Sequence, residues 1–173
     1  MTTLGNFNKP TWGIIEDAGG SGNNQKALAV TAPSAGQITR LGAWFFDYAP
    51  ALDAPNWTYQ LCVWNAGTGA LLAHSATMTS TAFAIARLEA DLTSPLAVTE
   101  GQALLIGWAR ASSKYIAYAV GASGSGTHYE KTQSSWPGSM SGAGSQPYKM
   151  GCYAYLTVVS KPLKPLTESY GVV

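Results

Sequence analysis

Residues 57–76 read WTYQLCVWNAGTGALLAHSA, and this stretch decides the fold class. Its first half alternates between two sets of side chains: Trp57, Tyr59, Leu61 and Val63 on one side, Thr58, Gln60, Cys62 and Trp64 on the other. A repeat of two is the period of a β-strand. The turn-forming run 65–69 then leads into residues 70–76, so the stretch predicts a β-hairpin.

Runs of the same kind lie on both sides of this hairpin, separated by clusters of Gly, Pro, Asn and Ser. We expect strands at 11–15, 26–32, 37–48, 83–92, 96–98, 102–109, 115–120, 127–131 and 150–158. No window keeps an apolar stripe of helical period with capping residues. About ten short strands at regular spacing predict an all-β fold, which we expect to be an antiparallel jelly-roll-like β-sandwich.

Several of these strands have an apolar face that should point into the core. In the strand at 26–32 that face carries Leu28 and Val30, and in the strand at 102–109 it carries Leu104, Ile106 and Trp108. The last strand should bury one set of side chains: Met150, Cys152, Ala154, Leu156 and Val158.

The chain of 173 residues has the usual length of one domain. We assign residues 11–159 to the sandwich, residues 1–10 to an N-terminal arm and residues 160–173 to an extended C-terminal tail. Two prolines in the tail favour an extended backbone. The tail is either a frayed end or an assembly arm laid on a neighbouring subunit, and its apolar side chains favour the arm: Leu163, Leu166, Tyr170 and Val172.

Composition excludes several functions. Charged residues are only 11 % of the chain and the net charge is +1, without the basic patch that nucleic-acid binding requires. No apolar run is long enough for a transmembrane helix, and residues 1–10 lack the pattern of a signal peptide. Cys62 and Cys152 lie in apolar runs, so they are either buried free thiols or one disulfide between two strands.

Groups suited to catalysis are scarce, and we expect no enzyme activity and no cofactor or metal. His74 lies in the return strand of the hairpin. A hydrolytic set could be assembled from Ser123 or Ser125, His128 and Glu130, but the chain contains no Gly-x-Ser-x-Gly nucleophile elbow.

Glu89 and Asp91 are two residues apart, so both should point to one face of a strand. Such a pair could serve a glycosidase or a calcium site. The alternative, which we favour, is a solvated strand edge, because charged residues protect the edges of sheets from pairing.

Aromatic residues are conspicuous in the second half of the chain. Tyr129, Trp136 and Tyr148 lie in or beside a long polar loop at 132–147. Aromatic rings with nearby amides and hydroxyls suit a subunit interface or a sugar-binding site. The turn at Trp136 could instead anchor the loop to the sandwich, and these three interpretations stay open.

The segment from Gln37 to Arg110, together with the preceding Gly36, contains GQITRLGAWF at 36–45, YQLCVWNAGTGALLAHS at 59–75 and LTSPLAVTEGQALLIGWA at 92–109. Its rhythm of strands and turns resembles jelly-roll modules of bacteriophage virion proteins, namely minor tail, fibre and head-decoration proteins. Carbohydrate-binding modules have a related layout. The resemblance carries no catalytic or ligand-binding residues.

The resemblance implies a virion structural protein that is assembled in the host cytoplasm and makes contact with other capsid or tail proteins. It also implies a homo-oligomer, with a trimer favoured. The alternative that it leaves open is a carbohydrate-binding module for attachment to a host or surface. Because both functions rest on fold analogy, each is an expectation.

Overall fold

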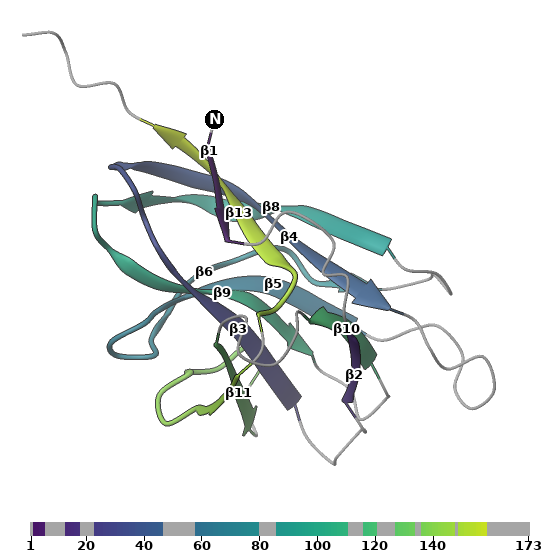
Figure 1. Cartoon of the computed structure of the whole chain (residues 1–173). Coiled ribbons are helices and arrows are strands. Elements are labelled where there is room, and N and C mark those ends of the chain that lie inside the picture. Colours follow the sequence, from purple (N-terminus) through teal and green to yellow (C-terminus); the bar gives the residue numbers. More distant parts are fainter. Residues whose placement is uncertain are drawn as a thin grey trace, which may run out of the picture.

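A computed structural model of the chain describes residues 2–5, 13–17, 23–46, 58–79, 86–110, 116–120, 127–133, 136–147 and 149–158. Every regular element in these ranges is a β-strand, and every strand pair is antiparallel. The strands form two sheets that pack face to face around one main hydrophobic cluster (Figure 1). The prediction of an all-β antiparallel sandwich is therefore confirmed.

Sheet A is built around one long central strand. That strand is β4 (Gly36–Phe46), and the same residues of it pair with β8 (Ala86–Val98) on one side and β13 (Cys152–Val158) on the other. Strand β1 (Thr2–Gly5) pairs with β13. The far end of β4 pairs with β10 (Ile116–Val120), which in turn pairs with β2 (Gly13–Asp17).

Sheet B contains the predicted hairpin, which is formed by β5 (Thr58–Asn65) and β6 (Leu71–His74). Its order starts with β12 (Gly144–Gln146), β11 (His128–Gln133) and β3 (Asn23–Thr31). It continues through β9 (Ala103–Arg110) and β5 to β6, and the short β7 (Met78–Thr79) also pairs with β5. Successive strands from β3 to β5 and from β8 to β11 alternate between the sheets, so most core contacts join distant parts of the chain.

The core faces follow the alternation in the sequence. Tyr59, Leu61 and Val63 lie in the main cluster, whereas Cys62 and Trp64 lie in a second cluster on the outer face of sheet B. The predicted inner faces of β3, β9 and β13 also contribute to the main cluster. Val158 is the exception: it pairs with Gly36 at the end of the sheet, beyond the core, and is 44 % exposed. Trp57 lies outside the described residues.

The N-terminal segment differs from the expected arm. Residues 2–5 form strand β1, in register with residues 153–156 of β13, and Leu4 inserts into the main cluster. One buried leucine in four residues gives too weak a pattern for a sequence to reveal. Strand β12, in the expected loop at 132–147, likewise lacks an apolar signal. The C-terminal tail, with Leu163, Leu166, Tyr170 and Val172, lies outside the described residues.

Residues 86–92 of the expected strand at 83–92 and the expected strand at 96–98 form the two halves of β8, and residues 83–85 lie outside the described residues. The register along β4 passes from the pair Arg40–Asp91 directly to the pair Ile38–Leu96, so residues 92–95 bulge out of the ladder. At this bulge Leu92 forms a bridge with Ser75, and the Thr93 hydroxyl donates to the carbonyl oxygen of His74 at 3.0 Å. These two contacts join β8 of sheet A to the chain at His74 and Ser75, at the β6 side of sheet B.

Both cysteines are free and buried, as one of the two alternatives expected. Cys62 belongs to the second cluster and Cys152 to the main cluster, and burial raises the pKa of both thiols. Within the ranges given above, no helix is long and apolar enough to cross a membrane, and no three metal-ligating side chains gather.

Candidate functional site

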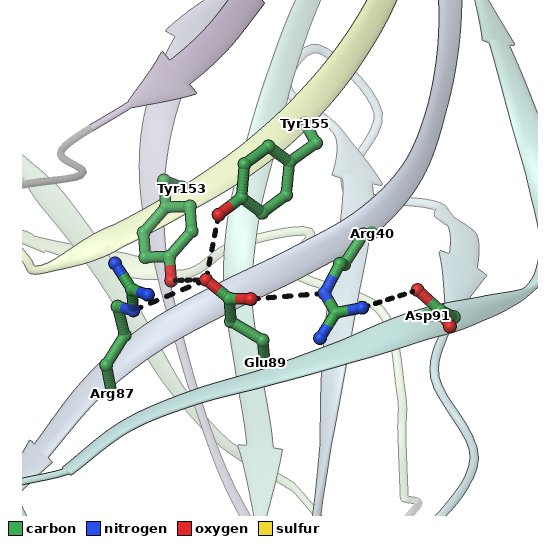
Figure 2. A network of polar contacts seen from close by, with 6 residues as sticks. All are labelled: Arg40, Arg87, Glu89, Asp91, Tyr153 and Tyr155. Atoms are coloured by element: carbon green, nitrogen blue, oxygen red, sulfur yellow. Dashed lines mark hydrogen bonds and ion pairs between the residues drawn. The ribbon is translucent and has the colours of Figure 1, made fainter. Parts of the chain in front are cut away.

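A polar network lies on the outer face of sheet A (Figure 2). The register of β8, β4 and β13 places Glu89, Gly42 and Tyr153 in one row across the sheet. Gly42 leaves room for the tyrosine ring, since a Cβ atom there would fall 2.1 Å from Tyr153 Cζ. Tyr153 can therefore lie flat across β4, and its hydroxyl reaches Glu89 on β8.

Glu89 is the centre of this network. The hydroxyl groups of Tyr153 and Tyr155 donate to Glu89 Oε1 at 2.5 and 2.8 Å. The Nε atoms of Arg87 and Arg40 lie 3.4 Å from Oε1 and 3.2 Å from Oε2 of the same carboxylate. The Glu89 side chain is only 17 % exposed, so these four groups replace much of its contact with water.

The next row of the sheet holds Asp91, Arg40 and Tyr155. Arg40 links the two rows, because its Nη1 atom donates to Asp91 Oδ1 at 3.4 Å. Asp91 is the most exposed member of the network, with a side chain 75 % exposed. The expectation that Glu89 and Asp91 share a face is confirmed, and β8 borders sheet A in the described part of the chain.

The network fixes the protonation states of Glu89 and Tyr153. Burial by itself raises the pKa of Glu89, but hydrogen bonds from Tyr153 and Tyr155 and the charges of Arg87 and Arg40 lower it overall. Burial and the hydrogen bond to Glu89 raise the pKa of Tyr153. At neutral pH Glu89 is therefore a carboxylate and Tyr153 a neutral phenol, an arrangement that holds the rings and guanidinium groups in place.

Replacing Glu89 with glutamine should destabilise the protein by about 2 kcal/mol at neutral pH, since hydrogen bonds to a charged group are lost. A lowered pKa in the folded state gives stability above the unfolded-state pKa, and this is lost as the pH falls through the folded-state value. The difference between wild type and variant should thus shrink in acid. Urea denaturation across this pH range measures it.

Asp91→Asn is the control for this prediction. The Asp91 side chain is largely in water and its contact with Arg40 is long, so the change should stay within about 0.5 kcal/mol. An equal effect of the two substitutions, or an effect of Glu89→Gln that grows in acid, would contradict the role given to Glu89.

The second cluster is covered by the loop of residues 136–143. Trp64 Nε1 donates to the Gly138 carbonyl oxygen at 2.8 Å, and the Gly138 amide donates to Gln25 Oε1 at 2.9 Å. Further along, the Met140 amide donates to the Gly69 carbonyl oxygen at 2.7 Å, and Met140 is buried. These bonds hold the loop against the outer face of sheet B.

Two of the three aromatic residues singled out in the sequence come together here. Tyr129 and Trp136 are both half-buried and pack against the second cluster. Tyr129 lies in β11, and the packing of Trp136 is that of a loop anchored to the sandwich; the interface and sugar-binding interpretations remain predictions. Tyr148 lies outside the described residues.

Sequence reasoning missed a polar group on the inner side of sheet B. Lys26 Nζ lies 2.6 Å from Glu130 Oε2, and Gln146 Nε2 donates to Glu130 Oε1 at 3.0 Å. The Lys26 side chain is only 7 % exposed. Lys26 has the same parity as the core residues Leu28 and Val30, and this signal could have revealed its burial.

Glu130 is held as a carboxylate. Its partial burial raises its pKa, but the hydrogen bond and charge of Lys26, the Gln146 amide and His128 lower it overall. Two residues of the hydrolytic set considered above are described by the structure. His128 is fully buried, and its Nε2 atom lies 3.9 Å from Glu130 Oε2. Ser123 and Ser125 lie outside the described residues.

No protein-family model matches the chain, and the search of curated proteins found no match either.

Proposed function

We propose that the chain is a non-enzymatic structural protein of a bacteriophage virion, of the capsid-decoration or minor-tail type, that acts through subunit contacts. The observation that supports a contact role is the outer face of sheet A, which presents Tyr155, Arg40 and Arg87 (Figure 2). Strand alternation places Trp44 on the same face, two residues beyond Gly42 on β4. Tryptophan, tyrosine and arginine carry much of the binding energy of protein interfaces. Glu89 contacts Tyr155, Arg40 and Arg87 and holds them in place before any partner binds. Less side-chain freedom is therefore lost on association.

The virion itself is proposed on the resemblance of residues 37–110 to phage jelly-roll modules. The partners are then other capsid or tail proteins and further copies of the chain, in a particle assembled in the host cytoplasm. A trimer is the favoured homo-oligomer. The sandwich fold is compatible with this proposal and supports it only by analogy.

Light scattering after size exclusion tests the contact role through a matched pair of variants. Asp91→Lys changes the outer face of sheet A at its most exposed charge, and Glu100→Lys makes the same charge change in an exposed turn after β8. The full chain should form a trimer or a larger species. Asp91→Lys should dissociate it, and Glu100→Lys should leave its mass unchanged.

A full chain that is monomeric at all concentrations would count against the homo-oligomer. Equal masses for Asp91→Lys and Glu100→Lys would count against this face as the contact surface. A chain that ends at residue 159 tests the assembly arm: loss of assembly supports the arm, and an unchanged mass removes it.

Carbohydrate binding is the alternative function, and one observation favours it. A groove of about 630 Å³ lies beside β3, where Tyr129 and Lys149 line it together with the hydroxyl-bearing Thr3, Thr31 and Thr127. An aromatic ring beside hydroxyl and ammonium groups suits a sugar. A glycan array probed with the wild type and with Tyr129→Ala decides this: binding that Tyr129→Ala abolishes supports it, and no binding excludes it.

A further inference from the structure

Buried polar atoms without hydrogen-bond partners lie in the layer of side chains on the outer face of sheet B, part of which the loop of residues 136–143 covers. They are Gln25 Nε2, Gln60 Oε1 and Trp136 Nε1, all of which are out of contact with water. Buried polar atoms of folded proteins almost always have a partner, and an orphaned one calls for a bound water or ligand. Their location in one layer suggests a shared site.

The register brings two of these groups onto one row. Gln25 on β3 and Gln60 on β5 both pair with Ala109 of the intervening strand β9, so they are separated by two strand spacings, or roughly 10 Å. Ala109 belongs to the second cluster, against which Trp136 packs. Its small side chain leaves the row low between the two glutamines.

The orientation of Gln25 is fixed by the loop. Gln25 Oε1 accepts from the Gly138 amide, so Nε2 is the end of the side chain that is left over as a donor. Trp136 is two residues before Gly138, and its indole Nε1 can only donate. The layer therefore offers two donors, one on the strand residue that the loop binds and one on the loop itself, and both need an acceptor.

The Gln60 side chain can act as a hydrogen-bond acceptor or as a donor in this layer. Its Nε2 atom donates to Thr77 Oγ1 at 3.2 Å, which leaves Oε1 as an acceptor in the layer. Because a hydroxyl such as that of Thr77 both donates and accepts, the Gln60 amide can also turn and present Nε2. The Gln60 amide can therefore accept from a bound hydroxyl group through Oε1 or donate to it through Nε2.

These requirements identify the ligand by its chemistry. Two donors and one adaptable amide match hydroxyl groups, each of which accepts and donates hydrogen bonds. An ion does not fit, because the layer is formed by apolar neighbours such as Ala27, Cys62 and Leu105. We propose that this layer is a binding site for hydroxyl groups, which accept from Gln25 Nε2 and Trp136 Nε1 and bond to the Gln60 amide.

Hydroxyl groups can come from trapped water or from a carbohydrate. The loop is tied down from Gly138 to Met140, whereas the Trp136 ring is half-buried, so this ring is the border of the site towards solvent. A sugar would enter there, and water needs no entrance wider than a brief opening of the loop. The proposal does not depend on the assembly function.

Nuclear magnetic resonance of the intact chain tests this proposal at the indole N–H of Trp136, identified by its loss in Trp136→Phe. In plain buffer we expect a cross-peak from this proton to long-lived water. Glucose, galactose, mannose and N-acetylglucosamine are then added in turn. Water as the resident gives the cross-peak and no sugar-dependent shift; a carbohydrate site gives a saturable shift and loss of the water cross-peak.

The indole N–H of Trp64 is the internal control, since it already donates to the Gly138 carbonyl oxygen and should show neither effect. Gln25→Met should abolish the water cross-peak or the sugar-dependent shift of the Trp136 indole proton. Gln37→Met, at an exposed position of β4, should leave both unchanged. Should Gln25→Met fail to fold, the wild-type spectra still decide. A Trp136 indole with neither a water cross-peak nor a sugar response overturns the proposal.

Discussion

Replacing Gly107 with alanine is expected to destabilise the protein by more than about 3 kcal/mol, at the upper end of what overpacking does. Gly107 lies in the centre of sheet B and pairs with Ala27 of β3 and Cys62 of β5. A Cβ atom there would fall 1.9 Å from the carbonyl oxygen of Lys26 and 2.6 Å from the Cα atom of Ala27. Both are backbone atoms, so the clash is relieved only by separating β3 from β9.

Urea denaturation followed by tryptophan fluorescence measures this effect, since Trp64 and Trp108 are buried. Gly67→Ala in the hairpin turn is the matched control, because its nearest neighbour would be Asn65 Oδ1 at the ordinary distance of 3.4 Å. We expect that change to stay within about 0.5 kcal/mol. Similar midpoints for the two variants would show that β3 and β9 do not pack as described.

The second large effect is expected at Glu130. Glu130→Gln keeps the shape of the side chain but removes the carboxylate beside the buried ammonium group of Lys26. Removing one partner of a buried ion pair costs about 3 kcal/mol. Lys26→Met should destabilise the protein less, because it removes the buried ammonium charge itself. The remaining carboxylate of Glu130 is 35 % exposed and can turn towards water.

The double variant with Lys26→Met and Glu130→Gln separates charge burial from loss of packing. It should be more stable than Glu130→Gln alone, because no ammonium group is then left without the carboxylate. Denaturation midpoints at neutral pH provide the comparison. If Glu130→Gln proves the mildest of the three variants, the Lys26–Glu130 pair does not stabilise the fold.

This pair also predicts a pH dependence. Because the pKa of Glu130 is lowered in the folded state, its contribution exists above the unfolded-state pKa and disappears as the pH falls through the folded-state value. The penalty of Glu130→Gln should therefore fade in acid.

The candidate contact face shows how far sequence reasoning reaches. The spacing of Glu89 and Asp91 alone places both on one face of a strand, and β8 does carry them on the outer face of sheet A. Nothing local indicates that Tyr153, 64 residues further along the chain, donates to Glu89. That contact requires β4 between β8 and β13, and a glycine at position 42 for the ring to cross.

The Lys26–Glu130 pair on the inner face of sheet B is a second contact between residues that are distant in the sequence. Parity assigns Lys26 to the buried side of Leu28 and Val30, but it identifies no partner for the lysine charge. Its partner Glu130 is 104 residues away, on a strand whose short polar pattern fits an edge or a loop. Burial of a lysine becomes tolerable only once the pairing of β3 with β11 supplies the carboxylate.

The sequence by itself therefore determined what depends on neighbouring residues: the strand period, the hairpin at residues 57–76, the faces of Tyr59, Leu61, Trp64 and Trp108, and the burial of both cysteines. Side-chain alternation is a local property of the backbone, so it is visible in one strand at a time. The tertiary structure alone decided which strands are neighbours, and with them the Glu89 network, the Lys26–Glu130 pair and the docking of the loop on Gln25. Those contacts join residues far apart in the chain, and their free energy exists only after the two sheets have formed.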